Sequence, residues 1–181
     1  MATSRTLETT RLRIEPFSEA HLTDRYVAWL NDPEVVRFSE QRHRNHTTES
    51  CRAYLASFDG TPHYFWAIVS RDLTLGHIGN INAYVDLHNR TADLGIIIGE
   101  LAVWGRGYGS EAWHAVCRFL LGDLRLRKVT AGTLAINAGM LGIMQRIGMR
   151  DDGRRIRHHI ADGREVDVIH MALFDDDDAG V

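Results

Sequence analysis

One segment of the chain, residues 94–112, restricts the possible folds more than any other. A buried-type apolar run ends there, three glycines follow at alternate positions, and a helical pattern begins at once. Glycines let the backbone approach a ligand closely and direct successive N–H groups into one concavity. The unpaired N–H groups and the positive end of a helix favour a diphosphate. The expected phosphate ligands are Gly105, Arg106, Gly107, Tyr108, Gly109 and Ser110.

Other glycine-rich structures fit this turn less well. An ordinary turn requires one glycine rather than three in register before a helix. A dinucleotide fingerprint requires Gly-x-Gly-x-x-Gly early in a parallel sheet, whereas the spacing here is Gly-x-Gly-x-Gly after three strands that look antiparallel. A Walker loop requires Gly-Lys-Ser/Thr, which is absent. Phosphate binding by a strand, turn and helix is the favoured interpretation.

Apolar periodicity along the rest of the chain predicts an α+β domain with a mostly antiparallel sheet. Strands are expected over residues 11–16, 64–70, 77–85, 92–99, 128–134, 156–160 and 166–173, and helices over 18–30, 47–58, 107–121 and 137–147. The run 92–99 is nearly continuous in apolar residues, which is typical of a central strand covered on both faces. Asp162-Gly163 predicts a tight hairpin turn. The order β-αα-βββ-αβ-α-ββ differs from repeating βαβ units.

Length and charge indicate one domain without a nucleic-acid partner. The chain has 181 residues, which suffice for one buried core. We expect a single domain over residues 1–174 and a disordered acidic tail over 175–181. The net charge of −3 argues against nucleic-acid binding. The cluster of Arg154, Arg155 and Arg157 is better explained as a solvated strand edge.

The cysteines and the chain start indicate the compartment. Cys51 and Cys117 lie far apart without a CxxC partner, which argues against a disulfide framework or a thiolate zinc site, so buried reduced thiols are expected. No histidine or carboxylate spacing suggests a metal. Residues 1–8 are polar, unlike a signal peptide, and no apolar run approaches the ~20 residues that span a bilayer. A cytoplasmic protein without a membrane partner is expected.

The glycine turn resembles the cofactor signature of the GNAT N-acetyltransferases. Their motif, Gln/Arg-x-x-Gly-x-Gly/Ala at the start of a helix, is matched by residues 104–109. Trp104 at the first position departs from the superfamily norm but is usual in the branch of the ribosomal-protein N-terminal (RimJ/RimL-like) acetyltransferases. Residues 8–13, Glu-Thr-Thr-Arg-Leu-Arg, and 29–35, Trp-Leu-Asn-Asp-Pro-Glu-Val, also agree with that branch. Asn137, eleven residues before Gly148, resembles the family's Asn…Gly-Phe element.

This resemblance implies the GNAT fold, acetyl-CoA as co-substrate, no metal, and a primary amine as acceptor. The strand around Ile98 is expected to pair with the pantetheine arm, and residues 105–110 to hold the pyrophosphate. Asn137 is expected to reach the pantetheine, and Arg146 to contact the nucleotide end.

Asp93 is the first choice for the base that deprotonates the amine. It stands where histone-modifying relatives carry a catalytic glutamate, and burial would raise its pKa. A strand-edge carboxylate that faces solvent is an equal alternative. Glu100 is a weaker candidate, and His77 or His88 could shuttle a proton.

The acid that protonates the leaving thiolate stays unassigned. Met144 occupies the position, seven residues after Asn137, where many GNAT enzymes carry a tyrosine. This departure keeps a second hypothesis open, a non-catalytic acyl-CoA-binding module.

The polar run over residues 40–47 is expected to form a rim of the acceptor site. It looks similar to bacterial enzymes that acetylate nucleotide-linked amino sugars, such as the pseudaminic-acid pathway transferase, and Arg42 and His43 could then bind phosphates. A solvated loop is an alternative. The ribosomal-protein branch suggests a peptide N-terminus as acceptor instead. The sequence does not specify the oligomeric state, and a homodimer is compatible with it.

Overall fold

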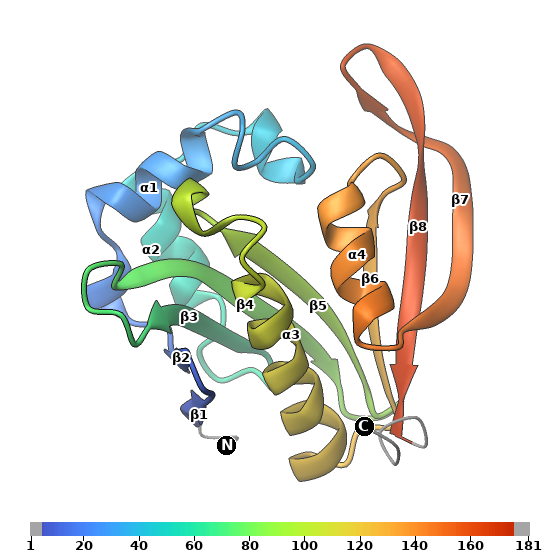
Figure 1. The fold of residues 1–181 in the computed structure, drawn as a ribbon, viewed down its shortest axis with the longest axis horizontal. Helices are drawn as coiled ribbons and strands as arrows, with labels where there is room; N and C mark the ends of the chain where they lie inside the picture. The colour runs from blue at the N-terminus through green and yellow to red at the C-terminus, as the bar shows by residue number, and fades with distance from the viewer. Residues whose placement is uncertain (1–4, 176–181) are drawn as a thin grey trace.

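The computed structural model describes residues 5–175, which form one eight-stranded sheet with helices on both faces (Figure 1). The strands are β1 (Leu7–Glu8), β2 (Leu12–Pro16), β3 (Tyr64–Ser70), β4 (His77–Asp86), β5 (Thr91–Ile98), β6 (Lys128–Leu134), β7 (Arg150–Ala161) and β8 (Arg164–Phe174). The helices are α1 (Asp24–Asn31), α2 (Thr48–Ala56), α3 (Tyr108–Arg118) and α4 (Ala138–Arg146), with 3₁₀ helices η1 (Glu19–His21), η2 (Glu40–His43) and η3 (Leu101–Val103) and the π-helical turn η4 (Phe119–Asp123). The predicted succession of elements is confirmed; β1 was not predicted.

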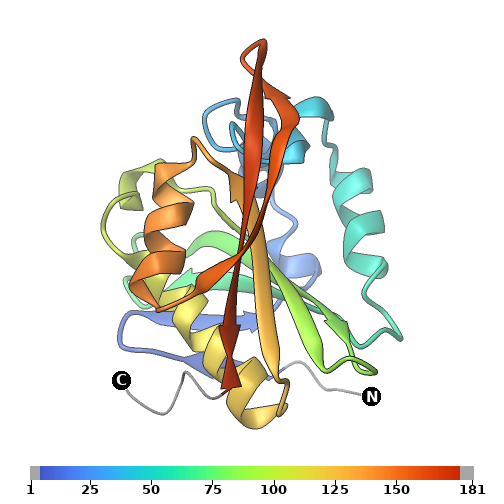
Figure 2. The same cartoon turned by 90° about the vertical axis from the view of Figure 1, so that its right-hand side faces the viewer.

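The sheet order is β1-β2-β3-β4-β5-β6-β8-β7, and all neighbours are antiparallel except β5 and β6. Alternate side chains along each strand face opposite sides. Trp66 and Ile81 belong to the larger core beside α3 and α4, whereas Phe65 and Ala67 belong to the smaller core beside α1 and α2. Figure 2 shows α2 on one side of the sheet and α3 and α4 on the other.

The parallel strands β5 and β6 pair only where they begin. The last paired residues are Asp93 and Thr130. From Leu94 onward, the edge of β5 that faces β6 therefore has no strand neighbour among the described residues. The prediction that this strand is covered on both faces is confirmed, since Ile96 and Ile98 pack against the larger core and Ile97 packs against the smaller one. Ile96, Ile97 and Ile98 are only partly buried, because they line a cavity in the opening between the two strands.

The first predicted helix, residues 18–30, is divided in two. Leu22 has a ψ of 59°, outside the helical range, and separates η1 from α1. Thr23 begins α1 because its side-chain oxygen accepts a hydrogen bond from the Tyr26 N–H at 3.2 Å. The Ser18 N–H donates to His21 Nδ1 at 3.0 Å instead of starting a long helix.

The last hairpin is longer than predicted. β7 begins at residue 150 rather than 156 and forms the sheet edge, where the arginine cluster is exposed, as predicted. Asp162 and Gly163 both have positive φ angles, 50° and 73°, which confirms the tight turn. The hairpin projects beyond the body of the sheet (Figures 1 and 2).

The remaining predictions on composition have mixed outcomes. Both cysteines are buried, as predicted, and neither forms a disulfide within residues 5–175. Of the predicted acidic tail, residues 176–181 lie outside the described residues, and the Asp175 N–H donates to the Arg127 carbonyl at 3.3 Å. No described helix has the length and apolar character to cross a membrane. Residues 5–175 contain no group of three or more metal-ligating side chains.

Candidate active site

A cavity of about 1010 Å³ lies in the opening between β5 and β6. Its lining includes Gly107, Ser110 and Ile143 from the α3 and α4 side of the sheet. It also includes Tyr54 and Asn82, whose side chains lie on the α1 and α2 side. The cavity therefore connects the two faces of the sheet, so one ligand can enter from each face and the two can meet in the middle.

The first turn of α3 supplies unpaired donors to this cavity. Gly107 caps the helix in the left-handed region, with φ 82°. The N–H groups of Gly107, Tyr108, Gly109 and Ser110 make no hydrogen bond within residues 5–175, and all four residues line the cavity. Four convergent N–H groups at the positive end of a helix form a site for a phosphate group.

Little space separates the turn from its neighbours. A Cβ atom on Gly109 would lie 3.1 Å from Ile143 Cδ1 and 3.5 Å from Ile98 Cγ1. Glycine at this position keeps the turn close to both β5 and α4. The residues present therefore fit a coenzyme diphosphate held between the strand and the two helices.

Two arginines near the turn differ in their placement. Arg146 on α4 donates from Nη1 to Ser110 Oγ at 3.1 Å, and both residues line the cavity. Arg106 is not among the lining residues, and its guanidinium lies 5.8 Å from the Tyr108 ring centroid. The structure thus brings Arg146, rather than Arg106, to the end of the cavity at the first turn of α3.

Residues 8–13, the first of the two additional family-like stretches, brace the back of the turn. The Glu111 carboxylate accepts hydrogen bonds from Thr9 Oγ1 at 2.6 Å and from the Arg11 N–H at 2.8 Å. Arg11 Nε adds a third at 2.6 Å, and Nη1 donates to the Arg106 carbonyl at 2.9 Å. Burial alone would raise the pKa of Glu111, but the bonds from Thr9 and Arg11 hold it below its usual range. The turn is therefore attached to the first strands of the sheet.

Polar, uncharged side chains form the floor of the cavity on the α1 and α2 side. In the register of β4 and β5, Asn82 lies opposite Gly95, and Tyr84 opposite Asp93. Asn80 is only 5% exposed, and its Oδ1 has no hydrogen-bond partner within residues 5–175. The hydroxyls of Tyr54 and Tyr84 lie 2.9 Å apart.

The second family-like stretch, residues 29–35, positions the rim of this floor. A Cβ atom on Gly99 would lie 2.0 Å from the Trp29 ring, so the indole packs directly on the end of β5. Asn31 Nδ2 donates to the His46 carbonyl, and Asn31 Oδ1 accepts from the His46 N–H, both at 2.8 Å. This pair of bonds fixes the loop that carries η2 over the cavity.

A family model for the GNAT acetyltransferase domain matches residues 11–150. The chain belongs to the GNAT acetyltransferase family. GNAT acetyltransferases transfer an acetyl group from acetyl-CoA to amines, and the predictions of family, fold and enzyme class are confirmed.

Solved structures with the same fold include three named acetyltransferases. RimL, a ribosomal-protein α-N-acetyltransferase solved with coenzyme A, is 14% identical with a TM-score of 0.83, covering 96% of this chain and 99% of that one. A ribosomal-protein alanine acetyltransferase from Vibrio fischeri is also 14% identical with a TM-score of 0.81, covering 96% and 98%. A chimeric spermidine N-acetyltransferase, part of it from Vibrio cholerae, is 16% identical with a TM-score of 0.81, covering 95% and 100%.

In this GNAT acetyltransferase, Asp93 lies at the point where β5 and β6 diverge. Its side chain shares the sheet face of Tyr84, next to the cavity floor but outside the cavity lining. The residue is exposed, yet partial burial of its carboxyl raises its pKa, which the nearby His170 opposes. Both the base and the strand-edge carboxylate remain consistent with this placement.

The other predicted proton carriers lie away from the cavity. Glu100 pairs with Arg25, and its carboxylate also accepts from the Ala102 N–H at 3.4 Å. His77 lies under α1, where burial, with a contribution from His21, lowers its pKa to about 4. His88 is exposed in the turn between β4 and β5.

Asn137 and Met144 both have structural contacts in α4. Asn137 lines the cavity, but its Oδ1 accepts from the Met140 N–H at 3.1 Å and its Nδ2 donates to Thr133 Oγ1 at 3.0 Å. Its amide therefore caps the helix. Met144 is fully buried in the core and does not line the cavity.

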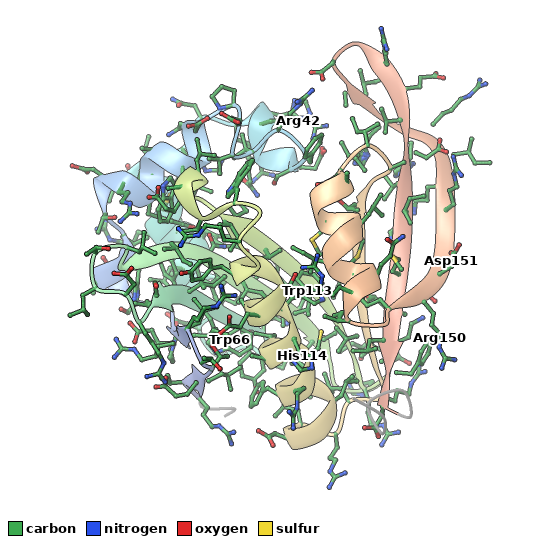
Figure 3. The ribbon with its side chains drawn as sticks, in the orientation of Figure 1. Arg42, Trp66, Trp113, His114, Arg150 and Asp151 are labelled. Carbon is green, nitrogen blue, oxygen red and sulfur yellow. The ribbon has the colours of Figure 1, made fainter. Side chains whose placement is uncertain are left out.

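The cavity rim over residues 39–46 is built from neighbours of Arg42 and His43, the two residues predicted from the sequence to bind the acceptor. Arg42 on η2 (Figure 3) donates to the carbonyls of Ser39 at 2.9 Å and Ile160 at 3.3 Å, and does not line the cavity. His43 is exposed and is also absent from the lining. The loop residues that line the cavity are Ser39, Glu40, Gln41, Arg44, Asn45 and His46. A polar run in the sequence could not show which of its residues line the cavity, because the 3₁₀ turn decides whether each side chain faces the cavity or solvent.

Proposed function

We propose that this chain transfers the acetyl group of acetyl-CoA to a primary amine, and that the two substrates enter from opposite faces of the sheet. The coenzyme binds on the α3 and α4 side, and the amine enters on the α1 and α2 side. The observation that carries this proposal is the cavity itself, which joins four unpaired N–H groups at one end to a polar, uncharged floor at the other.

The coenzyme is held by main-chain groups for most of its length. The turn from Gly105 to Ser110 binds the pyrophosphate, and Arg146 contacts the nucleotide end. Arg106, a turn residue that does not line the cavity, adds positive charge nearby. The free edge of β5 around Ile98 pairs with the pantetheine arm as an added strand would. Asn137 contacts the pantetheine from the start of α4, at the cavity wall.

Acetyl-CoA supplies the acetyl group as an activated thioester. The amine attacks only after losing a proton. Asp93, which lies beside Tyr84 next to the cavity floor, accepts that proton through a water molecule. Main-chain N–H groups on the free edge of β5 donate to the acetyl oxygen as negative charge grows on it. Because Met144 is buried, the thiolate leaves without a side-chain acid at that position.

The acceptor is a small amine, an amino sugar or a peptide N-terminus. The named structural relatives include enzymes for a polyamine and for ribosomal proteins. The charged residues on the acceptor side of the cavity lining are Glu34, Glu40 and Arg44, an almost balanced set. Such a lining supports an acceptor that carries no more than one or two charges rather than a strongly cationic polyamine.

A thiol-release assay tests the function. The full chain is given acetyl-CoA with glucosamine, spermidine or an alanine-initiated peptide, and free coenzyme A is measured with a thiol reagent. Amine-dependent release of coenzyme A is expected with glucosamine or the peptide. Tight acetyl-CoA binding without turnover of any amine would instead indicate the acyl-CoA-binding module.

A further inference from the structure

We infer that the side-chain amides of Asn80 and Asn82 form the subsite that binds the acceptor's amino group. This inference rests on the proposed function and specifies how the amine is held. Both residues lie on β4 two positions apart, so both face the α1 and α2 side, and both line the cavity.

Asn80 carries a buried amide oxygen that the described chain leaves unpaired. The residue is only 5% exposed, and its Oδ1 makes no hydrogen bond within the described chain. A buried polar atom without a partner destabilises a fold, and most such atoms in proteins are paired. The Oδ1 atom itself has almost no accessible surface, but Asn80 lines the cavity, so rotation of its amide would bring this oxygen to a substrate N–H group.

Asn82 extends toward the opening between the strands. Its partner across the sheet is Gly95, and a Cβ atom there would lie only 2.9 Å from Asn82 Oδ1. The amide therefore lies over β5, in space that any other residue at position 95 would occupy. Gly95 is the strand residue that allows Asn82 to approach the free edge of β5.

Two amide oxygens suit a primary amine before attack. A neutral primary amine has two N–H groups and one lone pair. When each N–H donates to one carboxamide oxygen, the lone pair is left directed away from the floor, toward the coenzyme side. A secondary amine has a single N–H, so it can satisfy only one of the two oxygens. The subsite therefore selects primary amines.

The test compares Asn80→Leu and Asn82→Leu with wild type, using whichever panel amine the wild type acetylates fastest. Each variant is expected to lower kcat/KM for the amine by about 10- to 100-fold, as loss of a substrate hydrogen bond to a buried group does. The acetyl-CoA dissociation constant should change less than about twofold. Wild type should also prefer the amine over its N-methyl derivative, and each variant should lose most of that preference.

Thermal unfolding separates this role from a structural one. Asn80→Leu removes an unpaired buried polar atom, so its melting temperature should not fall. Ser70→Ala is the matched control: Ser70 is buried on β3, outside the cavity lining, and accepts a hydrogen bond from the Asp72 N–H at 3.1 Å. That variant should be less stable but retain its KM values. Asn82 is partly exposed, so its variant tests the subsite even where Asn80→Leu does not fold.

The inference is overturned when both leucine variants keep the wild-type kcat/KM and the preference for the primary amine. It is also overturned when the variants lower kcat/KM for the amine and weaken acetyl-CoA binding to the same extent. A wild-type protein that binds acetyl-CoA but acetylates no amine defeats the proposed function itself. That result is visible before any variant is made.

Discussion

Arg11 and Glu111 stand a hundred residues apart, yet two hydrogen bonds join them beside the glycine turn that precedes α3. The Arg11 N–H donates to Oε1 at 2.8 Å and Nε donates to Oε2 at 2.6 Å. The guanidinium also lies 4.3 Å from the centroid of the Tyr108 ring. The first turn of α3 is thereby fixed to β2, which gives the N-terminal family-like stretch a physical role.

Arg11→Ala is expected to weaken acetyl-CoA binding by about tenfold. The variant loses the hydrogen bonds that hold the turn in its binding conformation, which reduces the binding free energy by roughly 1.4 kcal/mol. Calorimetric titration with acetyl-CoA measures the change. Arg13→Ala is the control, since Arg13, two residues further on in β2, pairs with the nearby Glu15 rather than with the turn. Equal affinities in the two variants would show that the turn holds its shape without Arg11.

Gly107→Val is expected to abolish measurable acetyl-CoA binding or raise its dissociation constant at least about 30-fold. A φ of 82° costs a β-branched residue on the order of 1–3 kcal/mol, and relief of that strain would turn the N–H groups away from the ligand. Gly122→Val serves as the control because Gly122 has no positive φ and open space around it. Unchanged affinity in the Gly107 variant would place the coenzyme elsewhere.

Asp93→Asn is expected to lower kcat by about 100-fold near neutral pH and to remove the acidic limb of the pH–rate profile. Burial raises the pKa of Asp93, so the folded protein binds this proton more tightly than the unfolded chain does. The folded protein is therefore stabilised by the protonated carboxyl, and this stabilisation is lost as the pH rises through the folded pKa of Asp93. The asparagine variant should be at least as stable as wild type at pH 7. An unaltered pH–rate profile would eliminate Asp93 as the base.

His77 is expected to make the protein less stable in mild acid. Burial lowers its folded pKa to about 4 from 6.5, so the unfolded chain takes up the proton first as the pH falls. Stability contributed by the neutral ring is complete above about pH 6.5 and is lost progressively toward pH 4, by up to about 3 kcal/mol. Urea unfolding between those pH values measures how steeply the free energy of unfolding depends on pH. His77→Gln should flatten it, and an equally steep slope would assign the effect to other groups.

Asn31→Ala is expected to raise the KM of the amine several-fold and to leave acetyl-CoA binding unchanged. The variant loses both hydrogen bonds to the His46 main chain. Their loss costs about 1–2 kcal/mol in total and lets the rim loop move. Steady-state kinetics with each substrate varied in turn separates the two effects. Asn89→Ala, in the exposed turn before β5, should change neither KM.

Local patterns were sufficient for most elements. Alternating and helical apolar spacing located β3 to β6, α2, α3 and α4, because each buries one stripe or face against the core. The division of the first helix was missed, since Thr23 caps α1 only when its side chain turns toward the Tyr26 N–H. The partial exposure of the second half of β5 was not predicted, because Ile96, Ile97 and Ile98 pack against the two cores and also line a cavity.

The sequence by itself determined the glycine turn, the helix that follows it and the membership of the family, since three glycines in register before a helix permit few conformations and few ligands. The tertiary structure alone decided which side chains share the cavity. It brought Thr9, Arg11 and Glu111 together across about a hundred positions and turned Arg42 and His43 away from the lining. It also left the Oδ1 of Asn80 buried without a partner in the described part of the chain. These outcomes depend on sheet register and on which face each element covers, and no local sequence pattern encodes contacts between segments so far apart.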